Sequence, residues 1–332
     1  GILSFDEWQG EYIGIKDCAV PQLRRKFEIK DKSATYMLHV NSLGYHEVYL
    51  NGEKVTEDVL SPAVSEMAKR SHSVTYDLTP LLKRGENDLM IWLGRGWYRD
   101  ALYPDVVVNK GPLVRVELSA IKDGKVETLL VSDSKWKARQ SEYTEYGSGT
   151  WKPYEFGGEV LDGSKVLADL KSKTLDKVEW QDAWVAEVPK HKVTPQMCEP
   201  NRIKEAITPK EIRQVGEGVW FVDMGKCLNG WVEIDFPELK AGEKVTMEYT
   251  DQLNEKGEFA PMPRGKIMFA DEYIAAGEGE EIFRKKFNHH AYQYMLISNL
   301  PTAPEKVTGY LITQNFRKAS EFDSSDKDLK DI

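Results

Sequence analysis

Apolar and polar residues alternate with a period of two over parts of the first hundred positions, as they do in half-buried β-strands. One such run covers residues 35–40, and a second covers residues 45–50 and ends at Asn51-Gly52. Both residues of that dipeptide tolerate the positive φ angles that a type I′ turn requires. The pattern therefore predicts two strands, the second of which leads into a β-hairpin turn.

Two further strand-like runs, residues 74–78 and 87–93, flank a short segment with helix signals. Thr79 can cap a helix, Pro80 suits its first position and Gly85 can stop it. The segment is long enough for about one turn, so we expect one helical turn between two strands.

The remaining apolar runs also have the length of strands, and no long helical pattern occurs in the second half of the chain. These runs are residues 113–118, 126–131, 219–222, 230–236, 245–249, 268–274, 283–287, 292–298 and 307–313. Residues 189–200 contain three prolines and no periodicity, which is typical of a linker between domains. We therefore expect an all-β fold of two β-sandwich domains, residues 1–190 and 191–318.

The composition excludes several classes of function. Hydrophobic side chains make up 41% of the 332 residues and charged ones 30%, as in an ordinary globular chain that buries a core. A net charge of −9 without a basic cluster argues against nucleic acid as a partner. No apolar run approaches the roughly 20 residues that span a bilayer, so we expect no membrane span.

The chain has three cysteines, Cys18, Cys198 and Cys227, which are far apart in the sequence. Their spacing gives neither a disulfide framework nor a CxxC metal pair. We expect free and mostly buried thiols.

Three segments in the first half resemble the N-terminal module of bacterial α-L-rhamnosidases. They are LGYHEVYLNGEKV at 43–55, YDLTPLLKRGEN at 76–87 and LGRGWY at 93–98. The middle segment alone is also similar to galactose-binding-like jelly rolls of other glycosidases, and the three in this order are more specific. The resemblance implies that the first domain is a galactose-binding-like jelly roll with short helical turns.

The second half resembles the β-sandwich that precedes the catalytic barrel in the same family. The matching segments are VWFVDMGKCLNGWVEIDF at 219–236 and DEYIAAGEGEEIFRKKFNHHAYQYMLISNL at 271–300. One departure is Gln293, where the family has an arginine. The final ASEFDSSDKDLKDI resembles the phrase that leads into an (α/α)6 barrel, so residues 319–332 would begin the connection to a catalytic barrel absent from the chain.

The sequence points to no catalytic residue. Glycoside hydrolysis needs two carboxylates at a set separation, but with 54 Asp and Glu residues such pairs are inevitable and uninformative. The family resemblance places the acid and the base in the barrel, beyond Ile332. The adjacent His289 and His290 would face opposite sides of a strand, and no HxH or HExxH spacing indicates a metal site.

The candidates for ligand binding lie in two loops of the first module, residues 94–100 and 157–163. Trp97 or Tyr98 could stack on a sugar face, and Glu159 or Asp162 could accept hydrogen bonds from hydroxyl groups. The resemblance also implies calcium, because some relatives bind rhamnose in this module through a calcium ion held by acidic and amide side chains. Arg95 departs from the acidic residue that is usual before Gly-Trp-Tyr. The alternative is that Trp97 and Tyr98 plug the end of the sandwich and the module packs against the barrel.

The resemblance implies that the chain is the non-catalytic N-terminal portion of a bacterial α-L-rhamnosidase. This portion would support the catalytic barrel and be inactive on its own, and the whole enzyme would act on rhamnose-containing glycans. It also implies a periplasmic or secreted location, and this expectation comes from the resemblance alone because no signal peptide is visible in the chain. The alternative is a free-standing carbohydrate-binding or adhesion protein without a barrel. The gene downstream of Ile332 would distinguish the two.

Overall fold

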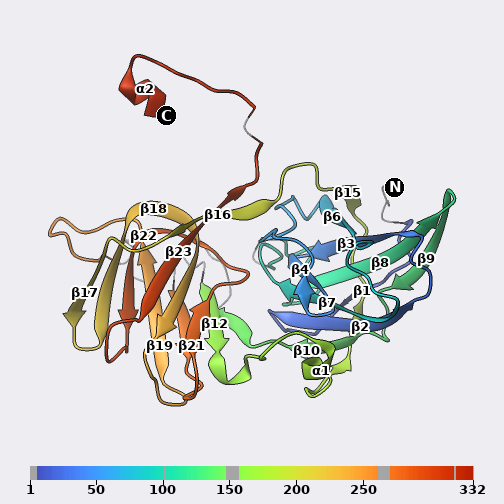
Figure 1. The fold of residues 1–332 in the computed structure, drawn as a ribbon, viewed down its shortest axis with the longest axis horizontal. Helices are drawn as coiled ribbons and strands as arrows, with labels where there is room; N and C mark the ends of the chain where they lie inside the picture. Colours follow the sequence, from blue (N-terminus) through green and yellow to red (C-terminus); the bar gives the residue numbers. More distant parts are fainter. Residues whose placement is uncertain (1–5, 101, 147–156, 261–269, 318, 332) are drawn as a thin grey trace.

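The structure, a computed structural model, describes residues 6–100, 102–146, 157–260, 270–317 and 319–331. The chain forms two sheet-rich halves that lie side by side, with the N-terminal half at the right of Figure 1. Strands dominate both halves, and the described helices are short: η1 (Gly163–Lys165), α1 (Ser172–Leu175) and α2 (Lys327–Asp331). The all-β fold class is therefore confirmed.

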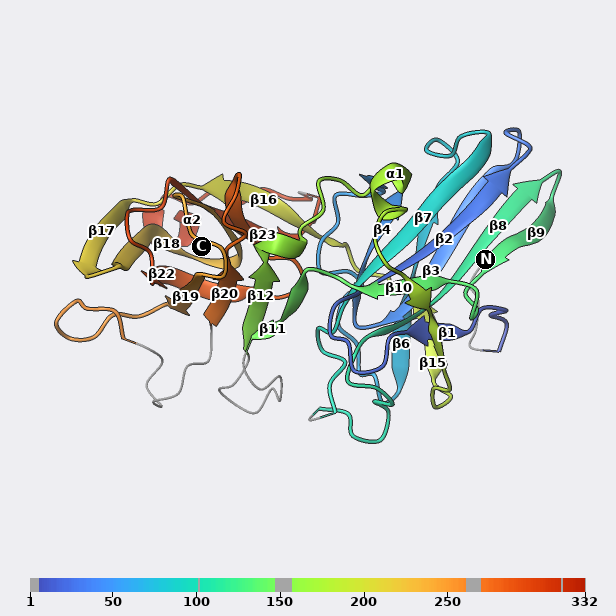
Figure 2. The ribbon, with the colours of Figure 1, turned by 90° about the horizontal axis from the view of Figure 1, so that it is seen from below.

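Two sheets pack face to face in the first half (Figure 2). One has the order β14-β1-β8-β3-β6-β15 with β9 beside β8, and the other has the order β13-β10-β2-β7-β4-β5. The strands of the first sheet are β1 (Tyr12–Gly14), β3 (Thr35–Leu43), β6 (Arg70–Asp77), β8 (Leu113–Lys122), β9 (Lys125–Val131), β14 (Trp184–Ala186) and β15 (Lys192–Pro195). Those of the second are β2 (Pro21–Ile29), β4 (Tyr45–Leu50), β5 (Glu53–Lys54), β7 (Gly85–Gly94), β10 (Lys137–Gln140) and β13 (Gln181–Asp182).

The core of this sandwich consists of the inward residues of the alternating pattern. Leu38 and Val116 from the first sheet and Leu23 and Ile91 from the second are all fully buried. The Asn51-Gly52 turn has positive φ at both residues and joins β4 to β5, as the dipeptide predicted. That the sandwich is a galactose-binding-like jelly roll stays a prediction.

The second half is one ten-stranded sheet that runs β11-β12-β20-β19-β22-β18-β23-β16, with β17 and β21 also paired to β18. Its strands are β11 (Tyr143–Tyr146), β12 (Gly158–Asp162), β16 (Asn201–Ile207), β17 (Glu211–Gly216), β18 (Val219–Phe236), β19 (Lys244–Thr250), β20 (Ala270–Ile274), β21 (Glu281–Arg284), β22 (His290–Ser298) and β23 (Lys306–Gln314). A register shift between Asp223 and Leu228 interrupts the pairing of β18 with β22. Such a bulge bends a long strand, and buried residues of β18 to β23 share one core.

Several expected elements differ from the structure. The segment after Thr79 is a turn, in which the Leu82 N–H donates to the Leu78 carbonyl over 3.0 Å, and no helix forms. The runs 219–222 and 230–236 belong to the single strand β18.

Three strands join a sheet on the other side of the expected division at residue 190. β15 lies in the predicted linker and pairs in parallel with β6 of the first sandwich. β11 and β12 precede residue 190, yet β12 pairs in parallel with β20 of the second sheet. The division into residues 1–190 and 191–318 stays a prediction, and residues 143–146 and 158–162 belong to the second sheet by their pairing.

The last described segment leaves the sheets. After β23 the chain runs out from the second half, and α2 stands apart from both sandwiches in Figure 1. Its role as the start of a connection to a barrel stays a prediction. No helix of the described chain has both the length and the apolarity that a membrane crossing needs.

Candidate functional site at the junction of the sandwiches

The two halves meet along a groove of about 460 Å³. Strands from both halves contribute to its walls: β4 and β5 from the first, and β11, β16, β18 and β21 from the second sheet. The lining residues are Glu47, Tyr49, Lys54, Glu57, Val59, Tyr143, Arg202, Ile203, Trp231, Arg284, Lys285 and Lys286. Pockets between domains are common ligand sites, so this groove is a candidate.

A charged cluster fixes the two halves to each other at this groove. Glu47 on β4 is buried and accepts hydrogen bonds from Lys54 Nζ at 2.5 Å, Lys286 Nζ at 2.7 Å and the Tyr49 hydroxyl at 2.7 Å. The Lys286 ammonium also lies 3.9 Å from the centre of the Trp92 ring. Because Lys286 comes from the second half and the others from the first, this cluster is an electrostatic bond across the junction.

The pKa values in this cluster follow from burial and pairing. Burial acts to raise the pKa of Glu47, but the charges of Lys286 and Lys54 outweigh it and lower the pKa to about 2. Burial acts to lower the pKa of Lys286, whereas Glu47 raises it above its usual value. The pair is therefore ionised at neutral pH.

Glu159 lies on the buried strand β12 and not in a loop, which corrects the sequence-based placement. Its carboxylate accepts the backbone N–H groups of Lys286 at 2.8 Å and Phe287 at 2.7 Å. Burial raises its pKa to about 7, and the neighbouring Asp271 adds to the increase. With both oxygens bonded to the backbone and 3% of the residue exposed, Glu159 fastens β12 to the segment after β21.

Asp271 and Lys285 form an ion pair beside Glu159 that is completely buried. Lys285 Nζ lies 2.8 and 2.7 Å from the two carboxylate oxygens of Asp271. The Tyr249 hydroxyl donates to the same carboxylate over 2.6 Å, and the Glu159 N–H donates over 2.7 Å. Asp271 is thus fully hydrogen-bonded, as a buried charge must be.

Ion pairs connect the loop at 94–100 to strand β11. Arg99 Nη2 donates to Glu145 of β11 over 2.6 Å, and Arg95 contacts both Glu145 and Asp100. Tyr98 is buried with 1% exposed, and its hydroxyl accepts the Val108 N–H over 3.1 Å. The Tyr98 ring therefore belongs to a core cluster at the end of the sandwich, which agrees with the plugging alternative.

Trp97 and Asp162 remain in reach of solvent. Trp97 is half-buried and packs against the core clusters of both halves. Asp162 caps η1, accepts hydrogen bonds from the Ser164 N–H and hydroxyl, and pairs with Lys165 at 2.8 Å. The structure does not bring the four candidates together, and their role in carbohydrate binding stays a prediction.

The candidate residues do not fit a calcium ion. Glu159 and Asp162 are three positions apart on one strand, so their side chains leave opposite faces. The Glu159 oxygens are bonded to the backbone, and Asp162 is paired with Lys165. Among the described residues, no three His, Cys, Asp or Glu side chains are arranged as a metal site.

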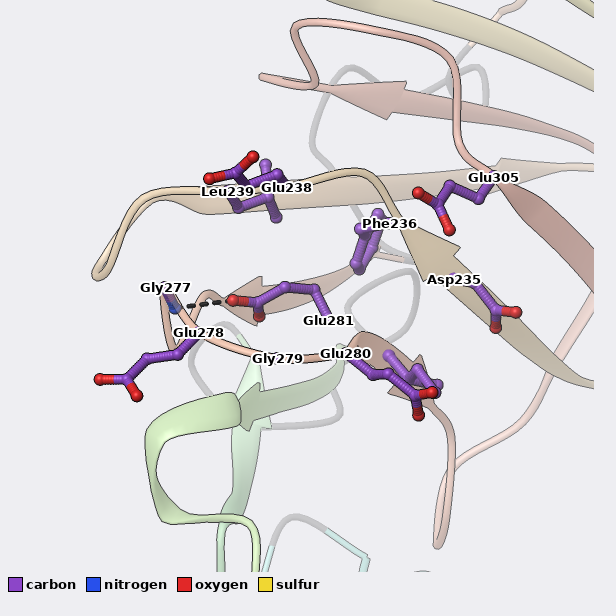
Figure 3. Close-up of a pocket in the computed structure, with 11 residues that line it drawn as sticks. Asp235, Phe236, Glu238, Leu239, Gly277, Glu278, Gly279, Glu280, Glu281 and Glu305 are labelled. Atoms are coloured by element: carbon purple, nitrogen blue, oxygen red, sulfur yellow. Dashed lines mark hydrogen bonds between the residues drawn. The ribbon is translucent and has the colours of Figure 1, made fainter.

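A second hollow, of about 540 Å³, is strongly acidic (Figure 3). Its acidic residues are Asp235, Glu238, Glu278, Glu280, Glu281 and Glu305. Glu281 turns inward and accepts the Gly277 N–H over 2.6 Å, so it stabilises the 277–280 turn. The other five acidic residues are exposed or half-buried around this hollow, where water can solvate their charges.

Two family models match the chain in tandem. The "Alpha-L-rhamnosidase N-terminal domain" matches residues 31–205, and the "Bacterial alpha-L-rhamnosidase concanavalin-like domain" matches residues 213–313. The chain belongs to the bacterial α-L-rhamnosidase family. The second model covers most of the ten-stranded sheet from β17 to β23.

Individual relatives agree with this family. An α-L-rhamnosidase of Formosa agariphila is 28% identical over 95% of this chain and 34% of its own length. The α-L-rhamnosidase structure from Dictyoglumus thermophilum has a TM-score of 0.79 at 24% identity, over 93% of this chain and 36% of that one. The Streptomyces avermitilis α-L-rhamnosidase, solved with L-rhamnose, has a TM-score of 0.77 at 24% identity, over 90% of this chain and 29% of that one. The chain thus spans about a third of the length of these relatives.

Sequence reasoning missed the groove. Its central residues, Glu47 and Lys286, are 239 positions apart, and no motif joins them. The available signal was the basic run Arg284-Lys285-Lys286 in a chain of net charge −9. Basic side chains in succession that become buried need acidic partners, but the sequence does not say which carboxylates supply them.

Proposed function

We propose that this chain is the non-catalytic N-terminal portion of an α-L-rhamnosidase-type glycoside hydrolase, and that it supports a catalytic barrel of the same polypeptide. The observation that carries the proposal is the tandem match of two rhamnosidase domain models over residues 31–205 and 213–313. The short share of each relative that the chain covers also supports it, since 34% of the Formosa agariphila enzyme matches. The hydrolytic acid and base would lie in the part of the polypeptide that follows.

The structure suggests how such support would work. A barrel that packs against two sandwiches needs them to present one rigid surface, and here Glu47, Lys286 and the shared core make the junction stiff. The proposal includes rhamnose-containing glycans as substrates of the whole enzyme and a periplasmic or secreted location. It also keeps a carbohydrate-binding role for the first module, with Trp97 and Asp162 as the candidates that solvent reaches.

The reading frame of the gene tests the hydrolase proposal against the alternative of a free-standing binding protein. We expect several hundred further codons with a helical-hairpin pattern after Ile332. A stop codon directly after that residue would contradict the hydrolase and favour the carbohydrate-binding or adhesion protein.

Calorimetry with L-rhamnose, with and without calcium, tests the sugar-binding part. We expect saturable heat that the Trp97→Ala variant abolishes, with Trp220→Ala in the second sandwich as the matched control. A flat titration in both conditions would refute sugar binding and leave the supporting role.

A further inference from the structure

The groove at the junction is basic although the chain is acidic. Five basic residues line it against two acidic ones, in a protein of net charge −9. Lys285 pairs with the buried Asp271, and Lys54 and Lys286 both pair with Glu47. The basic side chains that a ligand can reach most easily are therefore Arg202 and Arg284, which are 36% and 46% exposed. Guanidinium groups at the wall of a groove are typical binding groups for carboxylate, phosphate and sulfate.

Arg202 and Arg284, which line the groove, have N–H donors that their ion pairs do not use. Arg202 pairs with Asp58 through Nε at 2.9 Å and lies 3.7 Å from Glu57 through Nη1. Arg284 pairs with Glu233 through Nε at 3.2 Å. A guanidinium has five N–H donors, so each can keep its ion pair and still present terminal N–H groups to a carboxylate or sulfate.

The remaining wall suits a ring with hydroxyl groups. Tyr49 is half-buried and lines the groove, which offers an aromatic surface to the apolar side of a sugar. Trp231 also lines it with 4% exposed, and its indole Nε1 has no hydrogen-bond partner among the described residues. A buried N–H donor without a protein partner costs stability unless another group accepts a hydrogen bond from it.

We propose that this groove binds an anionic saccharide, with the acidic group held by Arg202 and Arg284 and the sugar ring beside Tyr49 and Trp231. Its 460 Å³ exceeds what a simple anion fills and falls within the range of about 300–1,000 Å³ of small-ligand pockets. The proposal does not depend on the proposed function, because neither rhamnose nor the barrel enters it. The acidic group can be a carboxylate or a sulfate.

Isothermal titration calorimetry on residues 1–332 tests the proposal with three disaccharides. They are digalacturonate, a sulfated disaccharide without a carboxylate, and neutral galactobiose. We expect saturable binding of at least one anionic sugar, and at least tenfold weaker binding of galactobiose. The anionic sugar that binds identifies the acidic group. The Arg202→Gln/Arg284→Gln variant should lose at least tenfold in affinity, whereas Arg84→Gln, an exposed arginine outside the groove, should bind as the wild type does.

A second measurement separates binding from misfolding. Both arginine variants are expected to keep the wild-type circular dichroism spectrum. In the wild type, the indole N–H resonance of Trp231, assigned from a Trp231→Phe variant, should shift on addition of the ligand. Binding of neither anion, equal affinity for galactobiose, or full affinity in the double variant would overturn the proposal.

Discussion

Asp271 and Lys285 form a completely buried ion pair in the second sandwich. Replacing Lys285 by Met keeps a side chain of similar length but leaves the Asp271 carboxylate without its cation. The ammonium lies 2.8 and 2.7 Å from the two oxygens, and neither side chain has exposed surface. Removing one partner of such a pair costs about 3–5 kcal/mol of stability, because the other charge stays buried. We expect that loss in the unfolding free energy of Lys285→Met.

Calorimetric and urea unfolding measure the effect, and Lys244→Met is the matched control. Lys244 pairs with Glu272 at 3.0 Å, but its side chain is 57% exposed, so its loss should cost at most about 1 kcal/mol. The variant that combines Lys285→Met with Asp271→Asn removes both charges and should be more stable than Lys285→Met alone. If Lys285→Met matched Lys244→Met to within about 1 kcal/mol, the reasoning on the buried charge would be refuted.

Three further outcomes follow from the packing and the titrating groups. A Cβ at Gly94 would lie 2.2 Å from the Phe287 ring, so Gly94→Ala should destabilise the protein by about 1–3 kcal/mol in thermal unfolding. At Gly216 the nearest atom to a Cβ is 3.5 Å away, so Gly216→Ala should change the melting point little. Equal melting points for the two variants would contradict this. Burial lowers the pKa of His46 to about 3, so the folded protein keeps it neutral while the unfolded chain protonates near pH 6.5. The contribution of neutral His46 to the unfolding free energy is complete above about pH 6.5 and is lost as the pH falls toward 3, by up to about 1.4 kcal/mol per pH unit. The unfolding free energy of His46→Gln should therefore depend less steeply on pH than that of the wild type. An unchanged slope would disprove the assignment. Burial also raises the pKa of the Cys18 thiol to about 12, so a thiol reagent should modify the other two cysteines in the native protein and spare Cys18 until it unfolds; rapid reaction of three thiols would contradict that burial.

Local patterns predicted most strands, because alternation and turn residues act over a few positions. The Asn51-Gly52 hairpin turn forms as expected, with positive φ at both residues. The turn after Thr79 has the same cap and stop signals as a helix, yet one turn of helix has too few hydrogen bonds to be stable by itself. The expectation of mostly buried thiols was wrong, since Cys198 and Cys227 are exposed.

Pairing between distant strands could not be predicted from these patterns. The glycines around Glu159 indicated a loop, but Gly158 begins β12, where a Cβ would come within 1.8 Å of the Ala270 carbonyl oxygen. The glycine serves close strand packing, and the carboxylate beside it is consequently buried. The two runs predicted at 219–222 and 230–236 are one strand, β18, whose pairing with β22 shifts in register between Asp223 and Leu228. A bulge and a break give the same sequence signal, so the pattern could not distinguish them.

We propose that residues 1–332 accompany a catalytic domain and carry out no hydrolysis themselves. Turnover of 4-nitrophenyl α-L-rhamnopyranoside, measured side by side for residues 1–332 and for the complete natural polypeptide, tests it most directly. We expect hydrolysis by the complete polypeptide and none by residues 1–332. Turnover by residues 1–332 that persists at constant specific activity through repeated purification would contradict it.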